Sequence, residues 1–534
     1  MLKLITLTFA ALALSACAGG ASTLRADMPS APVEDVSAQA IEAHIRFLAD
    51  DAMQGRDAGT RGYELAANYV EAQYRAIGLA PGGEDGYRAP VPLQTMSAVA
   101  DAAAFEIDGE ALTPGEDFIV FPSAVHDESD ITAPAVFVGR GIVAPGLGLD
   151  AYEGVDVAGK IVVALAGAPD GLPSDVAAHL GSTRTRAAFA AEAGAPGFIL
   201  IPAEGLTRWN YERLAAYAVR PSMTTAAADT GAGLKVQAAV STPTARALFA
   251  AAPQSFDAVL EAALNGEPMA SFALNTQVRL AQATTRERLV DDNVVGLLAG
   301  TDPDLSDELI VVTAHLDHIG VCRMDEAEDQ ICNGALDNAS GVAIMIETAR
   351  ALAQTGGARR PVAFVALAAE ERGLLGSAHI AQNPPPAWPA MAANINLDMP
   401  VIRYRFNDLV AFGAEHSTLG EAAQTAVSQR GLTLTPDPLP EQALFVRSDH
   451  YNFVREGVPS LFLMTGFSSP DPEDDEGQGF LRFLGGDYHA PGDEVDQVLF
   501  DQGARFAELN LAIINAVAND DATPRWRADS FFNP

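Results

Sequence analysis

The sequence predicts an α/β protein built on a mostly parallel mixed sheet that is sandwiched by helices. From residue 291 onward, short apolar runs typical of strands alternate with segments typical of helices. Alternation of this kind favours a parallel sheet with both faces covered. The chain has 534 residues, of which 49% are apolar, enough for two to four domains at roughly 100–200 residues each. The runs are ELIVVTAH, PVAFVALAA, ANINLD, DLVAFGA and PSLFLMT.

The segment before the sheet divides into two parts. Residues 36–81 show the spacing of two amphipathic helices around a glycine-containing turn, with Ile41, Ile45 and Leu48 on one face of the first. From about residue 130, β-branched runs separated by glycine predict a small, largely β module with its own core. We therefore assign residues 36–129 and 286–534 to one main domain, and residues 130–285 to an insertion within it.

The net charge of the chain limits the kinds of partner that it can bind. Lysine and arginine number 33 against 70 aspartates and glutamates, which gives a net charge of −37. An acid excess of this size repels phosphate backbones and anionic lipid headgroups. We therefore expect no nucleic-acid partner.

The amino terminus has the pattern of an export signal. Lys3 precedes an apolar stretch over residues 4–16, which is too short to span a bilayer comfortably. The sequence Leu-Ser-Ala-Cys at its end resembles the bacterial lipobox, which implies lipidation of Cys17. The alternative is an ordinary signal peptide cut near Ala16 or Ala18.

We accordingly assign residues 1–16 to a lipoprotein signal peptide and residues 17–35 to a polar tether. The expected location is the bacterial periplasm or cell envelope. Contact with a membrane is expected only through a lipid anchor at Cys17. No later stretch reaches 18 consecutive apolar residues.

Two further cysteines, Cys322 and Cys332, flank a short acidic loop. Export makes a disulfide between them plausible. The alternative is a pair of free thiols, and no other cysteine is available for a zinc knot.

Polar side chains follow three of the predicted strands at the points where those strands end. The carboxyl ends of parallel strands meet at one edge of a sheet, where ligands and catalytic groups gather. One such residue would indicate little, but three strands do so together, and two nearby loops add a further aspartate and histidine. The set is His315 and Asp317, Glu370 and Glu371, and Asp398 from the strand ends, with Asp337 and His489 from the loops.

This set suits a pair of zinc ions. Zinc binds imidazole nitrogen and carboxylate oxygen, and two histidines with three carboxylates can hold two ions if one carboxylate bridges them. Magnesium or manganese would prefer oxygen ligands alone. Of the adjacent Glu370 and Glu371, one can bind metal while the other acts as general base; a solvated first helical turn is the alternative. Asp317 suits the carboxylate that orients a metal-bound His315.

The order of the motifs resembles the co-catalytic di-zinc aminopeptidase family (metallopeptidase clan MH), which also contains glutamate carboxypeptidase, glutaminyl cyclase and transferrin receptor. The segment TRAAFAAEAGAPGFILIP further resembles the protease-associated domain found inserted in many exported peptidases. The resemblance implies a zinc-exopeptidase fold with that insertion. The motifs are His-x-Asp, Gly-Ala-x-Asp-Asn-Ala-Ser-Gly, Glu-Glu-x-Gly-x-x-Gly-Ser, Asn-x-Asp-Met and Tyr-His-x-Pro-x-Asp.

Carried over residue by residue, the family implies two Zn²⁺ per chain. Asp337 bridges the two ions, and a cis peptide bond follows it. Glu370 is the general base that takes a proton from the metal-bridging water, and Asp317 orients a ligand. The remaining ligands are His315 and Asp398 on one ion, and Glu371 and His489 on the other.

Three further residues are candidates for the surroundings of the metals or the substrate pocket: Asp449, His450 and Tyr488. For the segment RSDHY the alternative is a plain helix N-cap by Ser448 or Asp449. The chain has Pro400 where the family often has glycine.

The resemblance implies an exported aminopeptidase that acts on peptides with a free amino terminus. Carboxypeptidase activity is the main alternative, because loops carrying Arg403, Arg405 and Arg447 can supply a pocket for a terminal carboxylate. Cyclases of the family are typically short chains without an insertion. A non-catalytic binding protein, in the manner of transferrin receptor, is disfavoured because all five ligands and the base are present.

Overall fold

The computed structural model describes residues 36–207, 209–225, 233–323 and 329–534. The predicted signal peptide, the lipidation site Cys17 and the tether lie outside the described residues.

The larger of two sheets, sheet A, confirms the predicted α/β class. Its centre is four parallel strands, flanked by antiparallel neighbours on both sides. The parallel strands β17 and β21 are buried along their whole length, as expected for strands covered on both faces. In spatial order the strands are β2 (Arg88–Ala98), β13 (Phe272–Leu298), β17 (Val362–Leu367), β14 (Glu308–His315), β18 (Ala390–Leu397), β21 (Ser460–Thr465), β19 (Asp408–Phe412) and β20 (Thr433–Thr435); β1 (Ala80–Pro81) pairs with β13 and β11 (Ser222–Thr225) with β2.

Helices cover sheet A on both faces. Alternate residues of β14 enter different cores: Ile310 and Val312 pack in one, Leu309 and Val311 in the other. The first core takes residues from α1 (Ala38–Leu48), α2 (Arg61–Ile77), α8 (Ser340–Gln354), α10 (Leu419–Gln429), α12 (Gln478–Arg482) and α13 (Phe500–Asn519). The second takes residues from α9 (Leu375–Gln382) and α11 (His450–Arg455).

A second sheet, sheet B, has its own cores on both faces. It takes strands from both sides of the predicted boundary at residue 130. In spatial order they are β4 (Glu110–Ala111), β3 (Ala104–Ile107), β13, β6 (Glu128–Phe137), β9 (Ile161–Leu165), β10 (Gly197–Ile201), β12 (Val236–Val240) and β5 (Phe118–Phe121). Nearby elements are β7 (Val143–Ala144), β8 (Leu149–Asp150), α3 (Ser174–Gly181), α4 (Thr183–Glu192), α5 (Tyr211–Ala218), α6 (Thr242–Leu248) and α7 (Phe256–Leu264).

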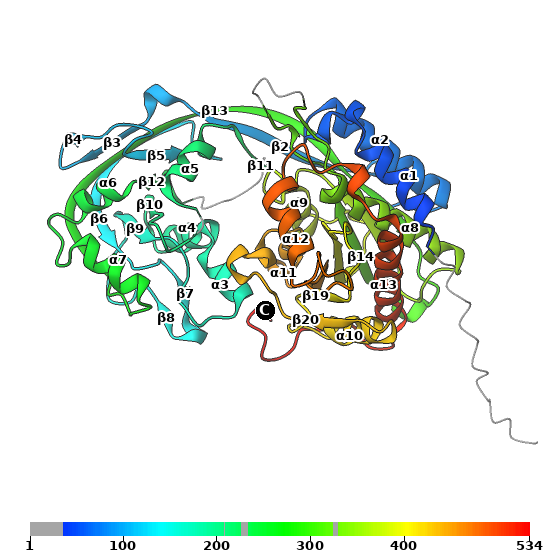
Figure 1. The fold of residues 1–534 in the computed structure, drawn as a ribbon. Helices are drawn as coiled ribbons and strands as arrows, with labels where there is room; N and C mark the ends of the chain where they lie inside the picture. Colours follow the sequence, from blue (N-terminus) through cyan, green and yellow to red (C-terminus); the bar gives the residue numbers. More distant parts are fainter. Residues whose placement is uncertain (1–35, 208, 226–232, 324–328) are drawn as a thin grey trace, which may run out of the picture. The chain divides into compact units, whose positions relative to one another are not determined.

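Strand β13 belongs to both sheets. Its first half, to Ala283, pairs with β6 in sheet B, and its second half, from Thr284, pairs with β2 and then β17 in sheet A. Figure 1 shows it as one long strand that runs through both parts. We call the elements around sheet B, residues 104–283 without β11, the second lobe.

Among the described residues, the structure has no helix long and apolar enough to cross a lipid bilayer.

Candidate metal centre

The polar residues predicted to share one edge of the sheet do lie together. Strand β14 is hydrogen-bonded between β17 and β18, and all three run in the same direction. His315 is the last residue of β14, Asp398 directly follows β18, and Glu370 follows β17 by three residues. The parallel order of the three strands therefore brings these side chains to one place.

Two groups of donors form there, and Asp337 belongs to both. In the first, His315 Nε2 lies 3.2 Å from Asp337 Oδ1 and 3.1 Å from Asp398 Oδ1. In the second, His489 Nε2 lies 3.2 Å from Asp337 Oδ2 and 3.1 Å from Glu371 Oε2. Each carboxylate oxygen of Asp337 thus faces a different group, which is the arrangement a bridging ligand requires.

His318, which the sequence reasoning missed, also converges with Asp337 and Glu371 of the second group. Its Nδ1 lies 2.8 Å from Glu371 Oε1, and its side chain is fully buried. It stands three residues after His315 in TAHLDHIG, so the same strand-end argument could have identified it.

The donor set fits zinc. Imidazole nitrogens and carboxylate oxygens are zinc ligands. Donor atoms lie within 4.8 Å of one another in two sets, one of His315, Asp337 and Asp398 and one of His318, Asp337 and Glu371. His318 Nε2 is buried and makes no hydrogen bond to the described residues, while His318 Nδ1 and Glu371 Oε1 face each other at 2.8 Å. Buried polar atoms are rarely left without a partner, so these atoms are suited to a bound cation.

The turn that carries Asp337 is held from several sides. It spans Ala335–Ala339, and the Asp337–Asn338 peptide bond is cis. The buried Asp493 carboxylate accepts hydrogen bonds from the N–H groups of Leu336 and Asp337, at 2.8 and 3.0 Å. Gly334 has a φ of 60°, and a Cβ there would lie 2.2 Å from the carbonyl oxygen of Asp337. Only glycine therefore fits before this turn.

Asp317 positions its neighbours differently from our expectation. Its carboxylate accepts hydrogen bonds from the main-chain N–H groups of Glu370 and Glu371, at 3.0 and 3.2 Å. The His315 ring contacts Asp317 through Nδ1, which lies 3.1 Å from the main-chain carbonyl oxygen. A carbonyl can orient a metal-ligating imidazole as a carboxylate does. The Asp317 carboxylate is thereby left to fix the two glutamates.

Glu370 faces the same cavity as the first donor group without joining either group. Its Oε2 lies 4.0 Å from His315 Nε2. Burial raises the pKa of Glu370 well above its usual range; His315 opposes the shift, while Glu371 and Asp398 add to it. For Glu371, burial is outweighed by His489 and by hydrogen bonds, which lower its pKa to about 2. The two adjacent carboxyls thus have opposite tendencies, and Glu370 is the one that holds a proton more readily.

An open cavity lies against the first group and Glu370. Its wall has an apolar part and also includes Arg447 and Tyr488; Arg447 donates a hydrogen bond to the Tyr488 hydroxyl at 3.1 Å. The Tyr488 ring also stacks on His489. The apolar residues are Met399, Leu444, Phe462 and Met464.

Asp449 and His450 do not line this cavity, whereas Ser448 does. The Ser448 hydroxyl donates a hydrogen bond to the Asp398 carboxylate. Asp449 precedes α11 but its side chain makes no capping hydrogen bond, and burial raises its pKa to about 7. The His450 ring packs against Phe445 and Phe462, and burial lowers its pKa to about 3.

Arg56 is a second residue that the sequence reasoning missed. It is fully buried and donates hydrogen bonds to the carbonyl oxygens of Leu48, Leu316, Asn333 and Gly334. Leu316 follows His315, and Gly334 precedes the turn of Asp337. One guanidinium therefore ties two loops of the site to the end of α1.

Cys322 and Cys332 form a disulfide. It closes the hairpin of β15 (Gly320–Val321) and β16 (Ile331–Cys332), beside the same loops.

Residues 293–514 match the family model described as peptidase family M28. Aminopeptidase YwaD of Bacillus subtilis strain 168 is 26% identical over 225 residues, which cover 41% of this chain and 43% of that protein. A probable zinc metalloprotease of Pyricularia oryzae strain 70-15 is 45% identical over 94 residues, 17% of each chain. The chain thus matches less than half the length of these relatives.

A solved aminopeptidase from Aneurinibacillus sp. strain AM-1 has a similar fold. It superposes with a TM-score of 0.52 at 19% identity, over 92% of this chain and 96% of that chain.

Proposed function

We propose that this chain, which belongs to peptidase family M28 through residues 293–514, is a zinc aminopeptidase that removes the first residue from peptides with a free amino terminus. The observation that carries the proposal is the division of the Asp337 oxygens between two groups of donors beside Glu370. That arrangement matches what a pair of metal ions acting on one bond requires.

The chain would hold two zinc ions, with Asp337 between them. Bound zinc would supply a Lewis acid for the scissile carbonyl and lower the pKa of water. The other ligands would be His315 and Asp398 in the first group, and Glu371 and His489 in the second, where His318 lies close to Glu371.

Glu370 would move the protons of the reaction. It would take one from the attacking water and pass it to the leaving amine, which is general acid–base catalysis by one carboxyl. The hydrogen bond from its own N–H to Asp317 fixes its main chain. The acidic groups around the cavity would favour a protonated α-amine, and the apolar wall favours an apolar first side chain.

Carboxypeptidase activity is the second candidate, and Arg447 favours it. Arg403 and Arg405 form ion pairs with Asp487 and Asp471 and do not line the cavity. Arg447 lines the cavity and, among the described residues, makes no ion pair. It is therefore the one predicted arginine in position for a terminal carboxylate.

A panel of amino-acid p-nitroanilides and amino-terminally blocked peptides separates the two activities. We expect cleavage of free amino-terminal substrates, fastest with leucine or methionine, and none of blocked peptides. A chelator should abolish the activity, and added zinc should restore it. Cleavage of blocked peptides alone would assign the carboxypeptidase activity, and turnover that resists chelator would contradict the metal centre.

We also propose that the chain is exported and anchored to a membrane by a lipid on Cys17, and that residues 130–285 form a protease-associated domain. The support is the lipobox pattern and the glycine-separated β-branched runs. In a bacterial host, the full chain should incorporate labelled palmitate and sediment with membranes. Cys17→Ala should do neither, whereas Cys322→Ala should keep the label. Equal labelling of both variants would refute the anchor.

A further inference from the structure

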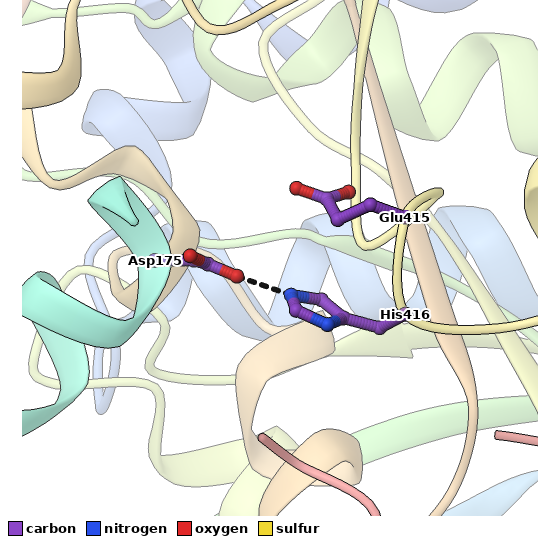
Figure 2. A group of neighbouring side chains, drawn as sticks. All are labelled: Asp175, Glu415 and His416. Carbon is purple, nitrogen blue, oxygen red and sulfur yellow. Dashed lines mark hydrogen bonds and ion pairs between the residues drawn. The ribbon is translucent and has the colours of Figure 1, made fainter. Parts of the chain in front are cut away.

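A third group of metal-ligating side chains lies away from the cavity. Asp175 comes from α3 of the second lobe, and Glu415 and His416 come from the connection between β19 and α10. One donor atom from each lies within 4.8 Å of the others. Figure 2 shows the Asp175 and Glu415 carboxylates on the same side of the His416 ring.

Two members of this group are buried and fixed in orientation. Asp175 and His416 are 5% and 6% exposed, and Asp175 Oδ2 contacts His416 Nε2. The other ring nitrogen, Nδ1, lies 3.0 Å from the Ser530 hydroxyl. This contact holds the ring so that Nε2 faces Asp175. Glu415 is exposed, which leaves solvent access to the group.

The charges of this group are unbalanced. Among the described residues, His416 is the only ion-pair partner of Asp175, and Glu415 has none. Asp437 is a further carboxylate that interacts electrostatically with both Asp175 and Glu415. Two carboxylates thus lie beside one imidazole, with a third carboxylate near them, and partly buried negative charges need a compensating cation. A divalent ion would supply that charge.

We propose that Asp175, Glu415 and His416 form a structural site for a divalent metal ion, with zinc as the preferred ion. One imidazole nitrogen and two carboxylate oxygens are a zinc donor set, and the exposed side leaves a position for water. The site is separate from the cavity, because none of its residues lines that cavity.

The location suggests what the ion does. Helix α3 contacts the turn Leu444–Val446, and Leu444 forms part of the apolar cavity wall. His179 of α3 is also hydrogen-bonded to the Tyr451 hydroxyl at 2.6 Å. A metal held by Asp175, Glu415 and His416 would therefore fasten α3, which packs on this turn, to the connection between β19 and α10. Its role is structural, and it takes no part in the reaction itself.

Metal counting tests the site. The full chain would be stripped with chelator, dialysed against zinc and measured by plasma mass spectrometry. Glu415→Gln removes an exposed ligand, so the fold should survive, and this variant should hold one zinc fewer than the unchanged chain. The matched control Glu421→Gln, an exposed glutamate of α10, should lose none.

The same comparison in an Asp337→Asn background keeps this test independent of the proposed function. Zinc should still raise the melting temperature of Asp337→Asn, and adding Glu415→Gln should abolish that rise. Equal zinc in the unchanged chain and Glu415→Gln would overturn the site and leave a plain ion pair between Asp175 and His416. Equal loss in Glu421→Gln would also overturn it, as nonspecific binding to acidic surface.

Discussion

Replacing Glu370 by glutamine should lower kcat by about 10²–10⁴-fold, the usual contribution of a general acid–base group, while the zinc content stays unchanged. Glutamine has nearly the same shape but cannot accept a proton. Glu370 lies 4.0 Å from His315 Nε2, farther than the residues of the two donor groups. Loss of the Glu370 carboxylate should therefore leave the zinc content unchanged. Steady-state kinetics on leucine p-nitroanilide and mass spectrometry of bound zinc measure the two quantities.

Glu371→Gln is the matched control, because it changes the adjacent residue in the same way. Glu371 contacts His489 and His318, so this variant should lose zinc together with activity. If Glu370→Gln loses zinc and Glu371→Gln keeps it, the two glutamates have been assigned in the wrong order.

Replacing Arg56 by methionine should lower the free energy of unfolding by about 3–5 kcal/mol, the cost of breaking a buried charged contact from one side. Methionine fills much of the same space but donates no hydrogen bond. Four main-chain carbonyls, two of them beside the metal ligands, would lose their donor. Urea unfolding followed by circular dichroism measures the change.

Arg61→Met is the control for Arg56. Arg61 is exposed at the start of α2 and pairs only with Glu64 among the described residues, so its loss should change the stability by less than about 1 kcal/mol. A similar effect of both variants would mean that the buried hydrogen bonds of Arg56 contribute little. Because Leu316 and Gly334 border the site, Arg56→Met should also weaken zinc binding.

The gathering of polar residues at one edge of sheet A could be predicted, because parallel strands end on the same side. The positions of His315 and Asp398 follow from strand order alone, whereas Glu370 stands three residues past β17 and its main chain is held by Asp317. The position of Asp337 is different: it depends on the turn held by Asp493, whose carboxylate meets that turn only in the folded chain.

Arg56 and Asp317 make contacts with main-chain groups that the sequence did not predict. Arg56 donates to carbonyl oxygens, and every residue type has one, so no pattern in the sequence identifies its partners. Asp317 was expected to hold the His315 ring with its carboxylate, but that carboxylate binds N–H groups of the next strand's loop. Asp449 and His450 directly follow Ser448, yet neither lines the cavity, and Asp449 acts on His315, Asp398 and Glu371 only through its charge.

The full set of strands in sheet B could not be predicted from the sequence either. The β-branched runs from residue 135 onward predict its central strands, whereas β3 and β5 come from residues 104–121. These earlier strands are short and carry no boundary signal of their own. Their membership depends on pairing with β13 and β12, which lie more than a hundred residues later in the chain.

Because both sheets share strand β13, the second lobe cannot be deleted without disturbing the rest of the chain. Its 27 residues form one strand that pairs with strands of both sheets. An excision that ends within it would expose an open edge on the sheet that carries the metal ligands. Heat or mechanical force that frees one end of the strand would likewise be transmitted along the backbone to the other sheet. The two sheets would then unfold together, as a single cooperative unit.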